Sequence, residues 1–410
     1  MKNDSQLPFW ALVDQATVSA TRFLIAVIVG KYGSEAELGL YAAGFGVLVT
    51  IVGLQESLIT TPYTFCTTQL DKLRQLSFAG SALTFVLLYL TVVTLLLGGA
   101  TAALWFFDAN GDFLPIMLAL ALITPTSLLR EFTRRWLFAH LRIRMATLLD
   151  GLFSVVTLAL LLGLVWFDAV SALYALLITG LASAVIVVCA FQFRRSFNLQ
   201  RRGMRGDFAK KFSFGKWSAG ASLLTATMMY FAPWYLIATQ GEASAGLYAA
   251  CLTLVLLANP LLLGLSSILA PIAARAFSEE GKIGVRRVVS KYLLIVTVLL
   301  IGFAGILSLT GDTLLGIVFD TSYQGNQYTI NVLSLAMIGI GINFNLANGL
   351  YALGHPRQDL YAAAIGLSVT IFLAWLTQPS NPAQMANCFT SGVFAMAIYR
   401  IAVFGLFVRR

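Results

Sequence analysis

The chain has 410 residues, of which 59% are hydrophobic and 11% are charged, and its formal net charge is +9. Ordinary soluble domains carry about 25% charged residues, so this composition excludes a soluble globular protein and indicates a membrane protein with several spans. The four cysteines are scattered without CxxC spacing, which supports neither a disulfide framework nor a metal site. We expect no metal and no cofactor.

Apolar runs of about 20 residues predict the membrane-spanning helices. The first run directly follows the short polar segment MKNDSQLPF, so we expect it to be retained rather than cleaved as a signal peptide. Twelve such runs are predicted, near residues 10–30, 38–61, 77–106, 113–138, 145–167, 169–193, 213–238, 246–270, 288–310, 328–353, 360–377 and 384–407.

The positions of the basic residues predict how the chain is oriented. If the N-terminus is cytoplasmic, every lysine and arginine except Arg22 and Lys31 falls in an inner segment. Such asymmetry is typical of multi-pass proteins, whose cytoplasmic segments are rich in positive charge. We therefore predict a protein of the cell (inner) membrane with both termini cytoplasmic. The basic stretch RRSFNLQRRGMRGDFAKK is then an orientation signal that contacts anionic membrane lipids, and we expect no nucleic-acid partner.

A short internal repeat predicts how the spans are organised. The sequence GLYAA occurs at Gly39 and again at Gly246, 207 residues later, and each copy stands at the entry to a predicted span. Six spans separate the copies, and because six is even, the two halves are parallel repeats. We predict an all-α membrane protein with a six-helix lobe at 1–193, a basic linker at 194–212, a second lobe at 213–410, and a cavity between the lobes.

We take Asp14, Arg22 and Glu56 as the ionisable residues that lie within the membrane. Arg22 lies about 12 Å further along the first helix than Asp14 and on a different face, so the two do not pair directly. It is a candidate for binding an anionic substrate such as a phosphate or pyrophosphate. Alternatively, Arg22 snorkels or bonds carbonyl groups of another helix. Asp14 and Glu56 share a level near the inner end, where they form either a gate or a structural hydrogen-bond network.

The second half offers polar and aromatic candidates for a substrate cavity: Tyr230, Trp234, Asn259, Asn345 and Asn348. Asn345 and Asn348 share a helix face, as residues three apart do. Aromatic rings and amides suit sugars, although interfacial aromatics and interhelical amide bonds are also ordinary in membrane proteins.

The opening of the chain resembles that of a known transporter family. VDQATVSATRFLIAVIVGKYGSEAELGLYAAGF is similar to the start of bacterial polysaccharide exporters, the O-antigen flippase-like branch of the MOP (multidrug/oligosaccharidyl-lipid/polysaccharide) flippase superfamily. This superfamily also contains multidrug and toxin extrusion (MATE) proteins and lipid II flippases. The similar features are Asp14-Gln15, Ser19, Arg22-Phe23 and the Gly-Leu-Tyr entry to the second helix. Motif similarity is confined to about the first 65 residues and to residues 246–271, where the second copy of GLYAA begins.

The resemblance implies a MATE-like transporter that moves a lipid-linked glycan, of the polyprenyl-phosphate type, to the outer leaflet for lipopolysaccharide or exopolysaccharide synthesis. It implies a monomer without enzymatic activity that works beside polysaccharide polymerase or export machinery. The chain contains no GxxxxGK[ST] motif, so transport would be driven by an ion gradient or the membrane potential.

Two alternatives stay open. A multidrug/cation antiporter would exchange cations at a carboxylate, and only Asp14 and Glu56 could serve, because the seventh and eighth predicted spans contain none. A membrane-embedded glycan polymerase or ligase would need a long outer loop with catalytic arginine or histidine, and Lys31 is the only basic residue predicted outside.

Overall fold

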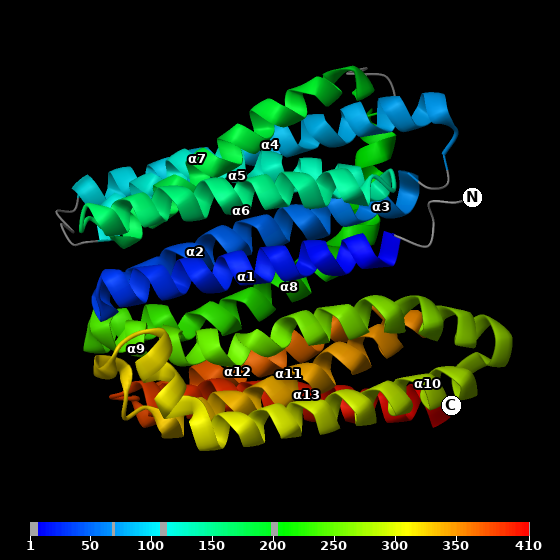
Figure 1. Cartoon of the computed structure of the whole chain (residues 1–410). Coiled ribbons are helices and arrows are strands. Elements are labelled where there is room, and N and C mark those ends of the chain that lie inside the picture. Colours follow the sequence, from blue (N-terminus) through cyan, green and yellow to red (C-terminus); the bar gives the residue numbers. More distant parts are fainter. Residues whose placement is uncertain (1–6, 68–69, 107–112, 198–203, 410) are drawn as a thin grey trace. The chain divides into compact units, whose positions relative to one another are not determined.

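The computed structural model describes residues 7–67, 70–106, 113–197 and 204–409, and these residues form helices and connecting turns without any strand (Figure 1). The helices, in chain order, are α1 (Leu7–Tyr32), α2 (Glu35–Gln55), η2 (Glu56–Thr60), α3 (Thr61–Thr67), α4 (Lys72–Phe106), α5 (Phe113–Ala139), α6 (Ile143–Trp166), α7 (Ala172–Ala190), η3 (Phe191–Ser196), α8 (Met204–Gln240), α9 (Glu242–Val255), η4 (Leu256–Ala258), α10 (Asn259–Val318), η5 (Thr321–Tyr323), α11 (Gln327–Ala352), α12 (Arg357–Thr377) and α13 (Pro382–Arg409).

The helices have the lengths that a bilayer requires. Lipid offers no hydrogen-bond partners, so a spanning segment must satisfy its backbone groups internally, as a helix does. Among the described residues, eleven helical segments are long and apolar enough to cross a membrane. One of them, Glu242–Val318, has 77 residues and would extend about 115 Å if it were straight, far more than one crossing needs. It turns back at Gly281, whose φ of 64° favours glycine, and so supplies two crossings. The predicted all-α fold with about twelve spans is confirmed.

The chain divides into two compact units. The first consists of Met1–Gly33 and Ala43–Ser222, and the second of Ser34–Ala42 and Leu223–Arg410. Thus the first turns of α2 belong to the second unit, and α8 contributes to both. The lobe boundaries expected from sequence stay a prediction. The helix α8 begins inside the predicted linker, and residues 198–203 of that linker lie outside the described residues.

In the first unit, α5 is the central helix and packs against α4 and α7, while α1 packs along α6. Three large aromatic side chains, Tyr63, Phe132 and Trp136, are buried in the core around α5. Two hydroxyls fix how α1 lies on α6: Thr21 donates to Ser154 Oγ at 2.6 Å, and Thr147 donates to the carbonyl oxygen of Trp10 at 3.2 Å. The core of the first unit is therefore rich in aromatic rings, and two hydroxyls hold α1 against α6.

Helix α2 ends in a single π-helical turn, η2. The Thr61 N–H bonds the carbonyl oxygen of Glu56, five residues earlier, instead of the usual four. The next residue is Pro62, which has no N–H to donate, so a local change in hydrogen bonding absorbs the proline without ending the helix. Glu56 therefore lies where the pattern of backbone hydrogen bonds in the helix changes.

In the second unit, α11 is central and packs against α10 and α13. Glycines on α11 allow this close packing. A Cβ at Gly341 would lie 2.5 Å from Leu300 Cδ1 of α10, and one at Gly349 would lie 2.7 Å from Phe404 Cε2 of α13. Small residues at such contacts let membrane helices approach where bulky side chains would separate them.

The two GLYAA copies meet each other within the second unit. Gly39 and Gly246 are each the fifth residue of their helices, α2 and α9. A Cβ on Gly39 would overlap the carbonyl oxygen of Glu242, and a Cβ on Gly246 would overlap that of Glu35. The contact is reciprocal, with each copy of the repeat supplying one glycine and one carbonyl. It explains why both copies require glycine at this position.

We predict that Gly39→Ala destabilises the protein by about 1–3 kcal/mol, because the added methyl meets backbone that cannot rotate away. Gly53→Ala is the matched control in the same helix: its Cβ would meet nothing within 4 Å. Alanine there should be neutral or stabilising by about 0.5–1 kcal/mol. Thermal unfolding of the purified variants in detergent measures both. Equal midpoints for Gly39→Ala and Gly53→Ala would contradict the contact.

Candidate functional site

The first unit contains a network of ion pairs built on α5. Arg134 donates through Nη2 to Asp14 Oδ2 at 2.5 Å and through Nε to Asp150 Oδ2 at 2.7 Å, so it bridges α1 and α6. Arg130, one turn earlier on the same face, donates to Asp150 Oδ1 at 2.5 Å. Both aspartates are almost fully buried, with 1% of Asp14 and 2% of Asp150 exposed. Three helices are thus joined by charge-assisted hydrogen bonds.

The same network reaches Glu56. Glu131 accepts from Arg134 at 3.3 Å and from Arg135 at 3.1 Å, and Arg135 also pairs with Glu56. This outer pair is more accessible: 35% of the Arg135 side chain and 33% of the Glu56 side chain are exposed. The structure therefore connects Asp14 and Glu56, which the sequence places at one level, through the arginines of α5.

Every carboxylate in this network has an arginine partner. Asp14, Glu56, Glu131 and Asp150 pair with the three arginines of α5. Such pairing is needed because removing a charge from water costs several kcal/mol unless a partner compensates it. Two polar atoms, Asp14 Oδ1 and Arg130 Nε, are buried without a hydrogen-bond partner in the described part of the chain.

Arg22 differs from the α5 arginines. It is exposed, and its guanidinium lies 5.9 Å from the centroid of the Phe45 ring. Within the residues that the structure describes, it forms no ion pair. The neighbouring Thr21 is buried against Ser154, and because successive residues of a helix point about 100° apart, Arg22 faces away from that contact. The structure thus presents a cation on an accessible face of an apolar helix.

The five polar and aromatic candidates of the second half differ in burial and in hydrogen bonding. Asn345 is buried and donates to the Gly341 carbonyl of its own helix at 2.8 Å, while Asn348 donates to the Phe344 carbonyl at 2.9 Å. These bonds stay within α11. The remaining three candidates are half-buried: Tyr230 and Trp234 on α8, and Asn259 at the start of α10.

The sequence analysis counted Arg130, Arg134, Arg135 and Arg400 only as basic residues of inner segments and did not expect them to form ion pairs between helices. In the structure they lie within the long helices α5 and α13, where 4% of the Arg400 side chain, 14% of Arg130 and Arg134 and 35% of Arg135 are exposed. The predicted orientation stays a prediction. Two signals were available in the sequence. Arg130 and Arg134 are spaced four apart, on one helix face, and Asp150 stands within an apolar run.

The second unit has a smaller network of its own. Arg400 on α13, only 4% exposed, pairs with Asp359 on α12. It also donates to Asn343 Oδ1 at 2.9 Å and to the Asn343 carbonyl at 3.2 Å. The Tyr351 hydroxyl donates to Asp359 Oδ2 at 3.2 Å. This network joins α11, α12 and α13 as the first one joins α1, α5 and α6.

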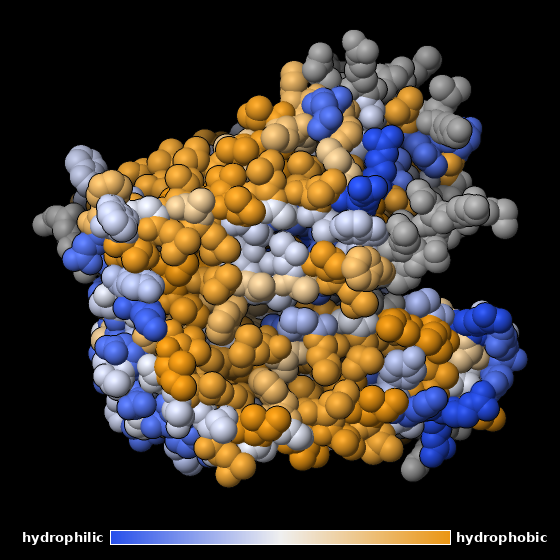
Figure 2. Space-filling view, in the orientation of Figure 1, coloured by the Kyte–Doolittle hydropathy of each residue, from blue (hydrophilic) through white to orange (hydrophobic). Residues whose placement is uncertain are grey.

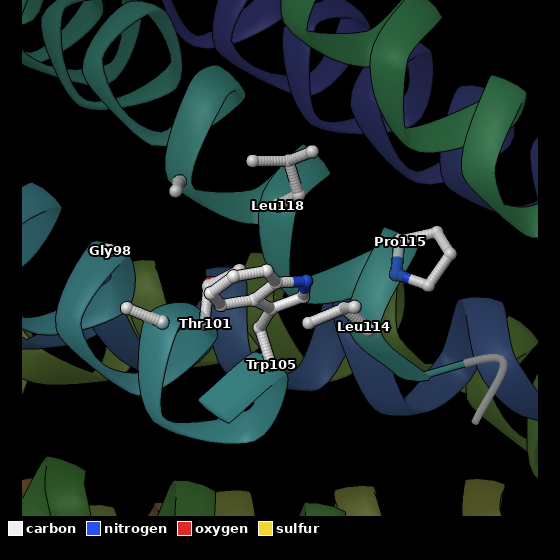
Figure 3. Close-up of a pocket in the computed structure, with 8 residues that line it drawn as sticks. Gly98, Thr101, Trp105, Leu114, Pro115 and Leu118 are labelled. Carbon is white, nitrogen blue, oxygen red and sulfur yellow. The ribbon is translucent and has the colours of Figure 1, made fainter. Parts of the chain in front are cut away.

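A cavity of about 490 Å³ lies between α4 and α5, away from these charges. Figure 3 shows the Trp105 ring beside Leu114 and Leu118. The lining is almost entirely apolar: Gly98, Thr101, Ala102, Trp105, Leu114, Pro115, Leu118 and Ala121. Because it offers almost no polar partner, this cavity is not suited to orienting a charged substrate. Among the described residues, no group of three or more His, Cys, Asp or Glu side chains is arranged to hold a metal ion.

Comparison with known proteins identifies the fold. No family model and no curated protein matches the sequence. Among solved structures, the chain is similar to a multidrug resistance MATE family transporter of the MOP superfamily in its inward-facing conformation, with a TM-score of 0.73 and 15% identity over 98% of this chain and 93% of that one. It is also similar to a MOP superfamily transporter from Pyrococcus furiosus for which reverse polarity of the binding pocket suggests a different function, with a TM-score of 0.73 and 13% identity over 98% and 94%. The chain therefore has the MATE fold.

We predict that Arg134→Met costs about 3–5 kcal/mol of stability, because it leaves Asp14 and Asp150 buried without their shared partner. Arg135→Met is the control, since its pair with Glu56 is about one-third exposed and should contribute about 0–1 kcal/mol. Chemical or thermal unfolding in detergent distinguishes the two. If both variants lose the same stability, the network is not held by Arg134.

Proposed function

We propose that this protein is a secondary transporter that exports an anionic amphiphile across the cell membrane, with an oligosaccharide linked to a polyprenyl-phosphate carrier as its substrate. The observation that carries the proposal is Arg22, an exposed arginine in the middle of an apolar helix that forms no ion pair in the described residues. Charges within membrane helices are costly and usually mark a substrate or ion path. A guanidinium presents paired donors that match the oxygens of a phosphate.

The state of the carboxylates supports an anionic rather than a cationic cargo. Asp14 pairs with Arg134, and Glu56 pairs with Arg135. These are the two carboxylates at which an antiporter would bind its cation, and each already has an arginine partner. In the second unit, Asp359 is bound by Arg400. A transported cation would have to displace an arginine from each of these pairs, against a charge-assisted hydrogen bond.

The other parts of the proposal rest on the sequence. With no nucleotide-binding motif, we infer that an ion gradient or the membrane potential supplies the energy. The half-buried Tyr230, Trp234 and Asn259 are the proposed sugar contacts, whereas Asn345 is less suited because its amide bonds its own helix. We further propose a non-enzymatic monomer of the inner membrane, with cytoplasmic termini, that supplies a polysaccharide polymerase or export machinery.

In cells that lack this protein, we expect glycan-loaded polyprenyl carrier to accumulate in the inner membrane. Wild-type protein and Arg22→Lys should reverse the accumulation, while Arg22→Gln should reduce export at least tenfold, because it removes the charge that holds the phosphate. Mass analysis of extracted lipids measures this, and Lys31→Gln on the same helix controls for lost charge. Full activity of Arg22→Gln would show that Arg22 does not bind the substrate phosphate.

A multidrug/cation antiporter is the second candidate, and the solved structures favour it directly: the similar transporter in its inward-facing conformation is a multidrug resistance MATE family transporter. In this case Asp14 would have to release Arg134 and take up a cation. Cells lacking the protein should then become sensitive to cationic dyes, and Asp14→Asn should fail to restore efflux while Arg22→Gln restores it. Unchanged dye sensitivity in the deletion strain would exclude this candidate.

A further inference from the structure

One helix of the second unit presents a face that is basic at one end and apolar beyond it. After the bend at Gly281, the helix α10 continues from residue 282 to Val318. Val285 and Val289 on its inner side pack against Leu346, Leu350 and Phe404. The residues on the opposite side therefore point away from the core of the unit.

The basic part of this face lies next to the bend. Lys282, Arg286 and Ser290 are spaced four apart and form one row along the helix, and Arg287 and Lys291 form the neighbouring row; all five are exposed. Arg287 pairs with Glu280, but Arg286 and Lys291 have no ion-pair partner in the part of the chain that the structure describes. Figure 2 shows hydrophilic side chains gathered at this bend, beside a hydrophobic surface.

The apolar part begins one turn later. Leu294, Ile295, Val298, Leu299 and Ile301 are exposed large hydrophobic side chains. Helical rise places Leu294 about 4.5 Å beyond Lys291, and Arg286 about 7.5 Å before it. The headgroup layer of a bilayer is roughly 5–8 Å thick on each side of the hydrocarbon. The change from basic to apolar thus has the dimensions of a lipid headgroup above its acyl chains.

We propose that this face of α10 binds an anionic phospholipid. The phosphate contacts Arg286 and Lys291 with Ser290 as a further donor, and the acyl chains lie along Leu294 and Val298. Charge complementarity favours this occupant, because the two cations without ion pairs match a lipid phosphate, and basic clusters beside a membrane helix attract anionic lipids. A second copy of the chain would bring apolar and basic surface against the same kind of surface. This site is independent of Arg22 and of the exported substrate.

Native mass spectrometry of the full-length protein in neutral detergent tests the proposal. The protein is titrated with phosphatidylglycerol or phosphatidylcholine, and bound lipids are counted. Each basic residue near an anionic surface contributes about fivefold in affinity, so Arg286→Gln/Lys291→Gln should weaken one phosphatidylglycerol site about 25-fold. Lys31→Gln/Arg74→Gln, which removes the same charge from other helices, should bind as wild type does.

Three outcomes would overturn the proposal. The double variant and wild type could bind phosphatidylglycerol equally, or wild type could bind both lipids equally at this site. Alternatively, the variant could lose a concentration-dependent dimer rather than a lipid, which would assign the face to a second copy. Because all the substituted side chains are exposed, unchanged unfolding temperatures are expected and serve as the check that each variant is folded.

Discussion

The first unit depends on a requirement that membrane burial imposes: each charge taken out of water must be compensated where it lies. Arg134 meets this requirement for Asp14 and Asp150 at once and thereby fixes α1, α5 and α6 relative to one another. In low dielectric surroundings such pairs are strong when complete and costly when broken. The same requirement gives the second unit its Arg400–Asp359 pair. In contrast to these arginines, Arg22 forms no ion pair within the described residues.

A second constraint is steric, and it acts where the two copies of the repeat meet. Gly39 and Gly246 let backbone approach backbone in a reciprocal contact that no side chain could enter. The two copies of the repeat are therefore also in direct contact with each other. They make the surface by which the first turns of α2 pack with α9 in the second unit, and this accounts for the glycine that the two copies share.

Much of the fold could be predicted from the sequence, because lipid leaves a chain few choices. The apolar runs predicted the helices, and the spacing of GLYAA predicted paired halves. The α5 network escaped prediction for a physical reason. Arginines near the end of an apolar run look the same in sequence whether they reach water or fold back onto aspartates of other helices, and only tertiary packing decides between these positions. Asp150 was likewise overlooked, since its partners lie on a helix 16 and 20 residues earlier in the chain.

The candidate site was predicted in part. Asp14 and Glu56 do share a network, as their common level indicated, but the α5 arginines that join them were assigned elsewhere. Arg22 could be recognised from depth alone, because an arginine so far from both ends of an apolar span is rare. Its exposure and its lack of an ion pair in the described residues required the structure. The fold agrees with MATE transporters whether the cargo is a lipid-linked glycan or a cationic drug, so the distinction between these cargoes rests on the charged side chains.

Reconstitution in liposomes distinguishes transport of a lipid-linked glycan from transport of a cationic dye. Liposomes containing the purified protein and a fluorescent oligosaccharide on a polyprenyl diphosphate are treated with a quencher that cannot cross the membrane, while an ion gradient or potential is applied. The account predicts that glycan initially protected in the inner leaflet becomes accessible with wild-type protein and not with Arg22→Gln. Accessibility no greater than in protein-free liposomes, together with gradient-driven movement of a cationic dye, would contradict it.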